Sequence, residues 1–168
     1  MTGSIALVGF MGAGKSRIGR MLAGRLGVPF VDTDKVITAQ HGSIAALFAE
    51  RGETGFRALE RDVVIDELAA AELAPRVVAL GGGAVTIADV RRALRRLPHV
   101  VWLDAPPEVL FARAQSGTRP LARDEAGFEA LYAQRRPLYG EVSTAVVRTR
   151  GRERLSWVAD RVIAAVAA

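Results

Sequence analysis

The sequence predicts an α/β protein in which a parallel β-sheet carries helices on both faces. Three observations predict this class. Short apolar runs alternate along the chain with longer segments of helical periodicity. The apolar runs lack the polar alternation of a half-exposed strand, so both of their faces are expected to be covered. A glycine-rich turn ending in Lys15-Ser16 joins the first apolar run to the first helical segment.

Five apolar runs are the candidate strands, and each is bounded by turn-forming or capping residues. The first ends at Gly9, and the second follows Gly27, which is placed to end a helix. The third ends at three consecutive glycines. The predicted strands are Ser4–Val8, Val28–Val31, Arg76–Leu80, Val100–Leu103 and Ala145–Arg148.

The segments between these strands place apolar residues at helical spacing. In the first of them Ile18, Leu22 and Leu26 share one face, which predicts an amphipathic helix. The segment Gln115–Ala126 is instead irregular and rich in Gly, Arg, Asp and Pro, and we expect it to form an exposed, mobile lid. The predicted helices are Lys15–Leu26, Thr54–Ala71, Ile87–Leu97, Pro107–Ala114, Phe128–Tyr139 and Ser156–Val166.

Length and composition narrow the class of protein further. A chain of 168 residues fits one domain, here 1–168. The absence of cysteine excludes a disulfide scaffold and thiolate chemistry. The net charge is +5, and only Lys15 and Lys35 among the 23 Lys and Arg residues are lysines, which indicates an anionic partner. No targeting segment or run of membrane-spanning length is present, so we expect a cytoplasmic protein with no membrane partner.

The segment Gly9–Ser16 fits the P-loop pattern of Gly, four residues and Gly-Lys-Ser. Its glycines permit a tight turn whose N–H groups, together with the following helix N-terminus, cradle phosphate oxygens. Lys15 is expected to reach the β- and γ-phosphates, and Ser16 to ligate Mg²⁺. The predicted nucleotide-binding residues here are Gly12, Ala13, Gly14, Lys15 and Ser16.

Two carboxylates follow the second predicted strand, in Asp32-Thr33-Asp34. In parallel sheets ligands bind beyond the carboxyl ends of the strands. One carboxylate there can hold Mg²⁺ through water, and the other can accept a proton from an attacking hydroxyl group. The alternative interpretation is that one of the two is a helix N-cap.

Arginines and glycines at three further places have two interpretations each. Arg57 lies three residues before Glu60, which suits either a surface ion pair or an arginine clamp for an anion. The glycines Gly81, Gly82 and Gly83 suit either a flexible turn or a close approach between backbone and ligand.

Arg119, in the irregular segment, is either a solvated residue or one that swings onto a transferring phosphoryl group. Arg135 and Arg136 either bind a carboxylate or favour the C-terminus of their helix. A basic stripe with no interleaved aromatic residue reads as a solvated helix face, with nucleic-acid binding as the alternative; it consists of Arg91, Arg92, Arg95 and Arg96.

In order and spacing these segments resemble shikimate kinases over nearly the whole chain. The resemblance rests on Gly9–Ser16, Asp32–Asp34, Gly52-Glu53 with Phe56-Arg57 and Glu60, Gly81–Gly83, Arg119-Pro120-Leu121, and Arg135 with Pro137-Leu138-Tyr139. It implies a three-layer P-loop fold with strand order 2-3-1-4-5. It also implies transfer of the γ-phosphoryl group of ATP to the 3-hydroxyl of shikimate, with Mg²⁺, in aromatic amino-acid biosynthesis.

The resemblance also implies residue roles. Asp34 contacts the reacting hydroxyl group, and Asp32 lies near Mg²⁺ through water. Arg57 and Arg135 clamp the shikimate carboxylate, and the backbone at Gly81, Gly82 and Gly83 contacts its ring. Arg119 reaches the phosphates and Arg113 stacks on adenine. The expected partners are ATP and shikimate, without nucleic acid, and the chain is expected to be a monomer. A kinase of another small acceptor, such as gluconate or a nucleoside monophosphate, is the alternative within enzymes.

Overall fold

The computed structural model describes residues 3–115 and 124–167. Its centre is a five-stranded, all-parallel sheet in the order β2-β3-β1-β4-β5. The strands are β1 (Ile5–Val8), β2 (Phe30–Asp32), β3 (Val77–Ala79), β4 (His99–Asp104) and β5 (Ala145–Arg148). The fold class and strand order predicted from the sequence are confirmed.

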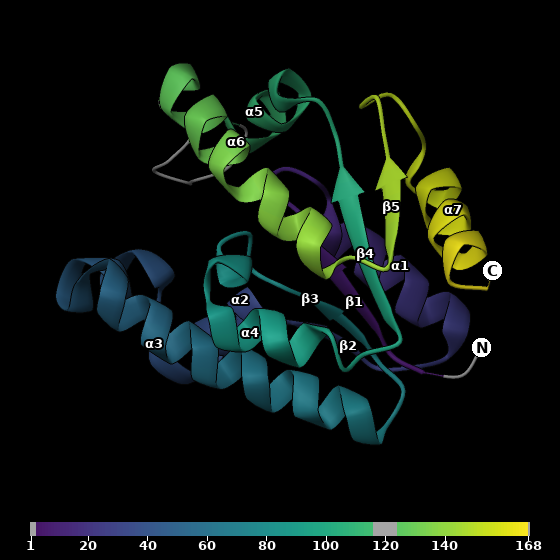
Figure 1. Cartoon of the computed structure of the whole chain (residues 1–168), viewed down its shortest axis with the longest axis horizontal. Coiled ribbons are helices and arrows are strands. Elements are labelled where there is room, and N and C mark those ends of the chain that lie inside the picture. The colour runs from purple at the N-terminus through teal and green to yellow at the C-terminus, as the bar shows by residue number, and fades with distance from the viewer. Residues whose placement is uncertain (1–2, 116–123, 168) are drawn as a thin grey trace.

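The helices cover both faces of the sheet (Figure 1). Helices α1 and α7 pack together behind the sheet in this view, and α4 lies in front of it beside α3. The bounds are α1 (Lys15–Leu26), α2 (Thr33–His41), α3 (Ile44–Leu73), α4 (Ala88–Leu94), α5 (Pro107–Gln115), α6 (Glu125–Val142) and α7 (Leu155–Ala167), with a 3-10 turn, η1, at Ala84–Thr86.

The central strand β1 is buried along its whole length because it lies between β3 and β4. Ile5 is in register with Val77 on one side and with His99 on the other. The apolar side chains of the sheet and the inner faces of the helices form one continuous core. This arrangement brings the ends of β1, β2 and β3, and the polar residues that follow them, to the same edge.

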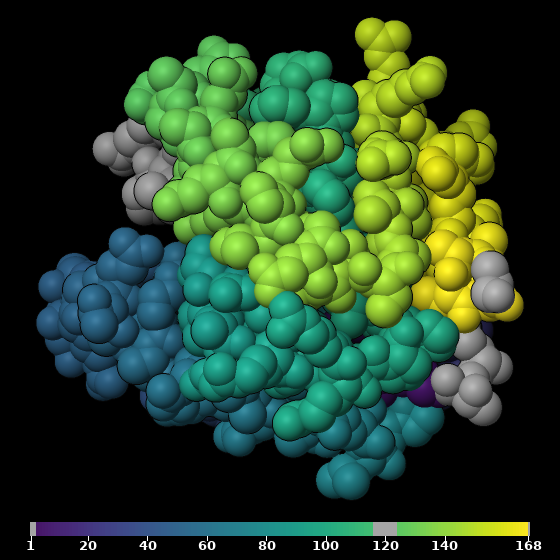
Figure 2. Space-filling model, viewed as in Figure 1, coloured from purple at the N-terminus to yellow at the C-terminus, as the bar shows by residue number. Residues whose placement is uncertain are grey.

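Two helical segments were not predicted from the sequence. Helix α2 begins directly after β2, and the first part of α3 precedes a break at Gly52, where φ is 65° and only glycine fits without strain. Ile37 and Leu47 from these segments pack with Phe56 and Val63 from the later part of α3 in a second, smaller cluster of buried residues. The start of α3 protrudes from the body of the molecule (Figure 2).

The irregular segment predicted at 115–126 falls mainly on residues 116–123, which lie outside the described ranges. At its borders Gln115 is the last residue of α5, and Glu125 begins α6 behind the N-cap Asp124. The prediction of a lid, and with it that of Arg119, therefore stays a prediction.

Candidate active site

The phosphate loop connects β1 to α1 in a conformation that requires glycine. Gly12 has a φ of 83°, and a Cβ atom there would lie 2.5 Å from the carbonyl oxygen of Leu110. The Nζ of Lys15 donates hydrogen bonds to the carbonyl oxygens of Gly9, at 2.7 Å, and Phe10, at 3.1 Å. Lys15 is thus held across the loop and buried, a position from which its charge faces the cavity described next.

A cavity of about 630 Å³ opens over this loop. The predicted residues Gly12, Ala13, Gly14, Lys15 and Ser16 line it, and so do Asp32, Asp34, Gly82 and Arg113. The Arg113 guanidinium donates to the carbonyl oxygens of Gly12, at 3.4 Å, and Gly151, at 3.1 Å. Arg113 therefore bridges the phosphate loop and the segment after β5.

The opposite wall of this cavity was not predicted from the sequence. It consists of Thr149, Gly151, Glu153, Leu155 and Val158, from the end of β5 and the start of α7. These residues follow no known pattern of spacing. The one signal that points to them is their place beyond the carboxyl end of the fifth predicted strand.

Asp32 is the N-cap of α2, which is the structural interpretation left open by the sequence. Its Oδ1 accepts hydrogen bonds from the backbone N–H groups of Asp34, at 3.1 Å, and Lys35, at 3.4 Å. Between the two carboxylates, the buried Thr33 hydroxyl accepts a hydrogen bond from the backbone N–H of Gly81, at 3.1 Å. The cap and this bond fix Asp34 against the turn after β3.

Arg57 forms an ion pair with Glu60, as their spacing predicts, but the pair is not on the surface. The Arg57 Nη1 lies 2.5 Å from the Glu60 Oε2, and the Glu60 side chain is only 2% exposed. Arg57 also lies 3.5 Å from the Glu53 carboxylate, and its guanidinium stands over the rings of Phe48 and Phe56. Burial raises the pKa of Glu60 above its ordinary value of 4.5, against the opposing effect of Arg57.

The turn after β3 is glycine-rich because charged side chains press against it. A Cβ atom at Gly81 would lie 2.6 Å from the Asp34 Oδ1 and 2.8 Å from the Glu60 Oε1. A Cβ atom at Gly83 would lie 2.2 Å from the Arg57 Nη1. Asp34, Glu60 and Arg57 thus converge on one backbone segment, and the predicted close approach of a ligand to these glycines stays a prediction.

Arg135 completes this cluster from α6. It is buried, its guanidinium stands over the Phe10 ring, and burial lowers its pKa, with the neighbouring Arg57 acting in the same direction. The Nε of Arg135 is buried and has no hydrogen-bond partner among the described residues. The Arg135 guanidinium is always charged and has one buried N–H donor without a partner among the described residues. It is therefore suited to bind a carboxylate from outside the chain.

Tyr139 lies one turn beyond Arg135 and was not predicted to take part in the site. Its fully buried hydroxyl donates a hydrogen bond of 2.6 Å to the carbonyl oxygen of Gly82. Burial raises the pKa of this phenol, so it stays a neutral donor. Arg136, the other arginine considered from the sequence, points away from this cluster, over the Trp102 ring.

The described residues contain no group of three or more His, Asp or Glu side chains arranged to hold a metal ion without help from a ligand. They also contain no helix long and apolar enough to cross a membrane. The site is thus built from a phosphate loop, two carboxylates and two arginines, with Arg119 outside the described ranges.

Comparison with known proteins shows the family to which the sequence is similar. The family model of shikimate kinase matches residues 11–167. The shikimate kinase of Symbiobacterium thermophilum is 44% identical over 94% of this chain and 92% of its own length. The shikimate kinase of Halorhodospira halophila is 46% identical over 96% of this chain and 92% of its own length. The solved structure of the Acinetobacter baumannii shikimate kinase in complex with shikimate has a TM-score of 0.89 and 35% identity over 97% of this chain and 92% of that chain.

Proposed function

The chain belongs to the shikimate kinase family, and from this premise we propose how its site transfers the γ-phosphoryl group of ATP to the 3-hydroxyl group of shikimate. Phosphoryl transfer needs alignment of the two substrates and stabilisation of charge, and it needs little covalent chemistry from the protein. The roles proposed below therefore concern binding, orientation and the movement of one proton.

The phosphate loop binds ATP. The backbone N–H groups of Gly12, Ala13 and Gly14 and the N-terminus of α1 hold the phosphates, and Lys15 adds a positive charge beside the γ-phosphoryl group. Arg113 stacks on the adenine, beside Gly151, whose carbonyl oxygen it contacts. Arg119 supplies further positive charge at the γ-phosphoryl group. The binding of ATP at the phosphate loop is supported by one cavity, which all the residues named in this paragraph except Arg119 line.

Ser16 and Asp32 fit the Mg²⁺ that accompanies ATP. Both line the cavity, and the cap of α2 uses only the Oδ1 of Asp32, which leaves Oδ2 for a water-mediated contact. Bound Mg²⁺ supplies positive charge to the β- and γ-phosphates. The two residues hold it in place: Ser16 through its hydroxyl group and Asp32 through water.

The cluster around Gly81–Gly83 binds shikimate. Arg57 and Arg135 clamp its carboxylate, since a planar guanidinium can donate two parallel hydrogen bonds to that group. Gly81, Gly82 and Gly83 contact the ring through their backbone. Asp34 accepts a hydrogen bond from the 3-hydroxyl group and orients it toward the γ-phosphoryl group. It receives the hydroxyl proton as the new P–O bond forms and the bond from the γ-phosphorus to the bridging oxygen of ADP breaks, with ADP as the leaving group.

The chain is further proposed to act as a cytoplasmic monomer without a nucleic-acid partner. The four arginines of the basic stripe on and after α4, which suggested such a partner, share three acidic neighbours. Arg91 and Arg95 pair with Glu141, Arg92 pairs with Asp89, and Arg96 lies 2.8 Å from Glu72. This pairing supports the interpretation of the stripe as a solvated surface.

The observation that supports shikimate over other acceptors best is the buried Arg135 with its unpaired donor, beside Arg57 and Asp34. We expect ADP release with Mg·ATP to depend on shikimate, and gluconate and a nucleoside monophosphate to give less than about a hundredth of its kcat/KM, a difference of roughly 3 kcal/mol. Preference for gluconate or the nucleotide in the same panel would contradict the proposal. Arg25→Gln, which breaks an exposed ion pair with Asp160, is the control for a surface change in the same substrate panel.

A further inference from the structure

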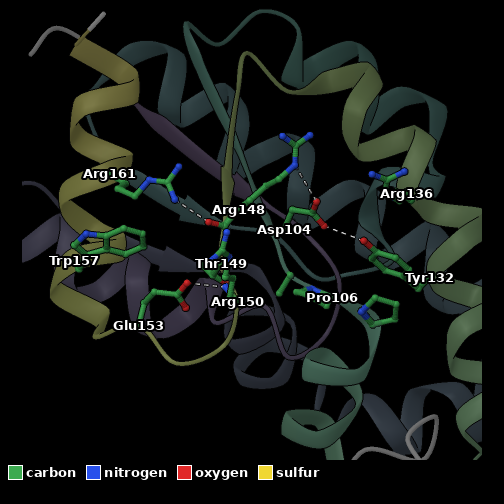
Figure 3. Close-up of a pocket in the computed structure, with 12 residues that line it drawn as sticks. Asp104, Pro106, Tyr132, Arg136, Arg148, Thr149, Arg150, Glu153, Trp157 and Arg161 are labelled. Carbon is green, nitrogen blue, oxygen red and sulfur yellow. Dashed lines mark hydrogen bonds and ion pairs between the residues drawn. The ribbon is translucent and has the colours of Figure 1, made fainter.

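A second cavity lies behind the segment that forms the far wall of the nucleotide site (Figure 3). Its volume is about 1000 Å³, and it opens between the ends of β4 and β5, α6 and α7. Small-molecule sites have volumes of roughly 300 to 1,000 Å³, so this cavity is large enough for a small ligand. None of the roles proposed above for ATP or shikimate uses it.

Four arginines surround this cavity: Arg136, Arg148, Arg150 and Arg161. Their side chains come from α6, from β5 and the residues after it, and from α7, and all four are exposed. The Arg161 Nη1 donates a hydrogen bond of 2.8 Å to the carbonyl oxygen of Arg148, and its guanidinium stands over the Trp157 ring. These contacts hold Arg161 in place, and no carboxylate of the described residues lies within 4.0 Å of its guanidinium.

The two carboxylates at this cavity are engaged in different degrees, since the buried Oε2 of Glu153 has no hydrogen-bond partner among the described residues. The Asp104 Oδ1 accepts a hydrogen bond of 2.9 Å from the Tyr132 hydroxyl, and its Oδ2 lies 3.7 Å from the Arg148 Nε. The Glu153 Oε1 accepts a hydrogen bond of 2.7 Å from the backbone N–H of Arg150, which closes the turn. Both acids thus maintain the walls of the cavity, and positive charge is in excess inside it.

This excess differs from the arginine-rich surface of α3 and α4. Other exposed arginines, Arg17, Arg20, Arg152 and Arg154, also lack a carboxylate within 4.0 Å among the described residues, but none of them lines this cavity. The arginines of α3 and those on and after α4 each lie within 4.0 Å of a carboxylate. Among the described residues, no carboxylate lies within that distance of Arg136, Arg150 or Arg161. Unpaired arginines from separate elements gather around one hollow, and this pattern is expected of a site for an anion with several charges.

The second cavity also shares its wall with the nucleotide site. Thr149 and Glu153 line both cavities. The backbone N–H of Thr149 donates a hydrogen bond of 2.9 Å to the carbonyl oxygen of Asp104, on one side of this wall. On the other side the Gly151 carbonyl accepts one from Arg113. A ligand bound in the second cavity would restrict the motion of this shared segment. The conformational entropy that the segment loses when ATP binds on its other side would then change.

We propose that the cavity between β4, β5, α6 and α7 is a second ligand site, which binds a small organic polyanion with two or more carboxylate or phosphate groups and alters the affinity for ATP through the shared residues 149–153. The four exposed guanidinium groups make the binding dependent on salt, because their attraction for the ligand is screened by ions. The coupling to ATP is reciprocal by thermodynamic linkage.

The test uses the full chain saturated with Mg·ADP and shikimate, so that the phosphate loop and the Arg57–Arg135 clamp are occupied. Benzene-1,3,5-tricarboxylate and fructose 1,6-bisphosphate serve as the carboxylate and phosphate probes, each titrated by calorimetry at low salt. We expect at least one of them to bind with 1:1 stoichiometry and a Kd below about 1 mM, a modest affinity for a site of exposed charges. In steady-state assays the same probe should change the KM for ATP at least about twofold and leave that for shikimate unchanged.

Charge-matched variants separate this site from a general effect of the positive surface. Arg136→Gln with Arg161→Gln should weaken probe binding about tenfold or more, because two charge-assisted hydrogen bonds are lost. Arg20→Gln with Arg92→Gln removes the same charge from exposed positions on α1 and α4. This double variant should change the affinity for the probe less than about twofold. Arg150→Gln is the second variant of the site, since only the backbone N–H of Arg150 forms a hydrogen bond in the structure.

Three results would overturn the proposal. The first is that neither probe binds the saturated protein up to about 10 mM, roughly ten times the Kd expected for the site. The second is an equal loss of binding in the two double variants, and the third is a KM for ATP that does not respond to a bound probe. Activity without probe is expected to be unchanged in all variants, so a failed kinase assay with shikimate would bear on the proposed function and not on this site.

Discussion

Gly83 is the residue at which the acceptor site is most sensitive to a single added carbon atom. Its φ of −94° and ψ of −12° are accessible to any residue, so alanine introduces no backbone strain there. Its Cβ, however, would take the space of the Arg57 guanidinium. We expect Gly83→Ala to displace Arg57 and raise the KM for shikimate by about tenfold or more, roughly 1.4 kcal/mol.

The matched control for this variant is Gly24→Ala. Gly24 lies inside α1, and a Cβ atom there would contact nothing within 4 Å. Alanine at this position should stabilise the protein by about 1 kcal/mol through helix propensity and leave both KM values unchanged. Steady-state kinetics and thermal unfolding of the two variants, side by side, check this; an unchanged KM for shikimate in Gly83→Ala would contradict the proposed role of Arg57.

Glu60 makes the hold on Arg57 dependent on pH. Its burial raises its pKa above 4.5, so the folded chain keeps a proton on Glu60 at a pH where the unfolded chain has lost it. The contribution of Glu60 to stability therefore falls as the pH rises from 4.5 through this raised pKa, and it is constant above that window. As the pH falls through the raised pKa of Glu60, a growing fraction of the molecules carries a protonated Glu60. These molecules lack the negative charge that holds Arg57.

We expect the KM for shikimate to rise as the pH falls through the raised pKa of Glu60, and this rise to begin above pH 4.5. Glu60→Gln should show a raised KM at neutral pH, with a flatter profile on the acid side, because it lacks the titrating charge. The check is the KM for shikimate across the acid range in both proteins. Parallel profiles would assign the acid limb to a group other than Glu60.

At the scale of elements, helix α2 shows how one residue can serve structure and chemistry together. Asp32 caps the helix through one oxygen, and the proposed role at Mg²⁺ uses the other. Asparagine keeps a side-chain oxygen for the cap and removes the charge, whereas alanine removes both. The two variants thus distinguish the two functions of the same side chain.

We expect Asp32→Asn to unfold at nearly the same temperature as the parent and to need at least about tenfold more Mg²⁺ for half-maximal rate, since one charged outer contact is lost. Asp32→Ala should show the same Mg²⁺ dependence and lose about 1 kcal/mol of stability in addition. Thermal unfolding and Mg²⁺ titrations of the rate measure the two effects. An unchanged Mg²⁺ requirement in Asp32→Asn would contradict the proposed role at Mg²⁺ and leave Asp32 with only its role as the N-cap of α2.

Elements differ in how far the sequence could predict them, for physical reasons. Helix α1 follows a glycine turn and has a regular apolar face, so its predicted bounds, Lys15–Leu26, match the structure. Helix α2 was missed because Thr33, Val36 and Thr38 have weak helix propensity, and its stability depends on the packing of Ile37 against distant residues. Such long-range packing leaves no periodic pattern in so short a segment.

At the scale of the whole molecule, local motifs were predictable and contacts across the fold were not. The glycine-rich loop and the Arg57–Glu60 spacing are visible within a few residues of sequence. The structure places the loop residues at one cavity and pairs Arg57 with Glu60. Strand order came from resemblance to a family, since the alternation of strands and helices allows several orders. The bond from Tyr139 to Gly82 joins residues 57 positions apart, and no spacing rule predicts it.

The division of the apolar residues into a large core and a small cluster has a consequence for dynamics. The cluster of Ile37, Leu47, Phe56 and Val63 is built from α2 and α3 alone, whereas the main core holds the whole sheet. Segments with few buried apolar residues open at a lower free energy than the global unfolding of the protein. Local unfolding is therefore expected to begin at α2 and the start of α3.

The proposed acceptor site spans the boundary between these two parts. Asp34 and Arg57 belong to the small cluster's helices, whereas Gly81–Gly83 and Arg135 belong to the main body. An acceptor that contacts both sides binds only the closed form, so by mass action it lowers the population of the locally unfolded one. The stability of this corner of the molecule is thus set by substrate concentration as well as by its own packing.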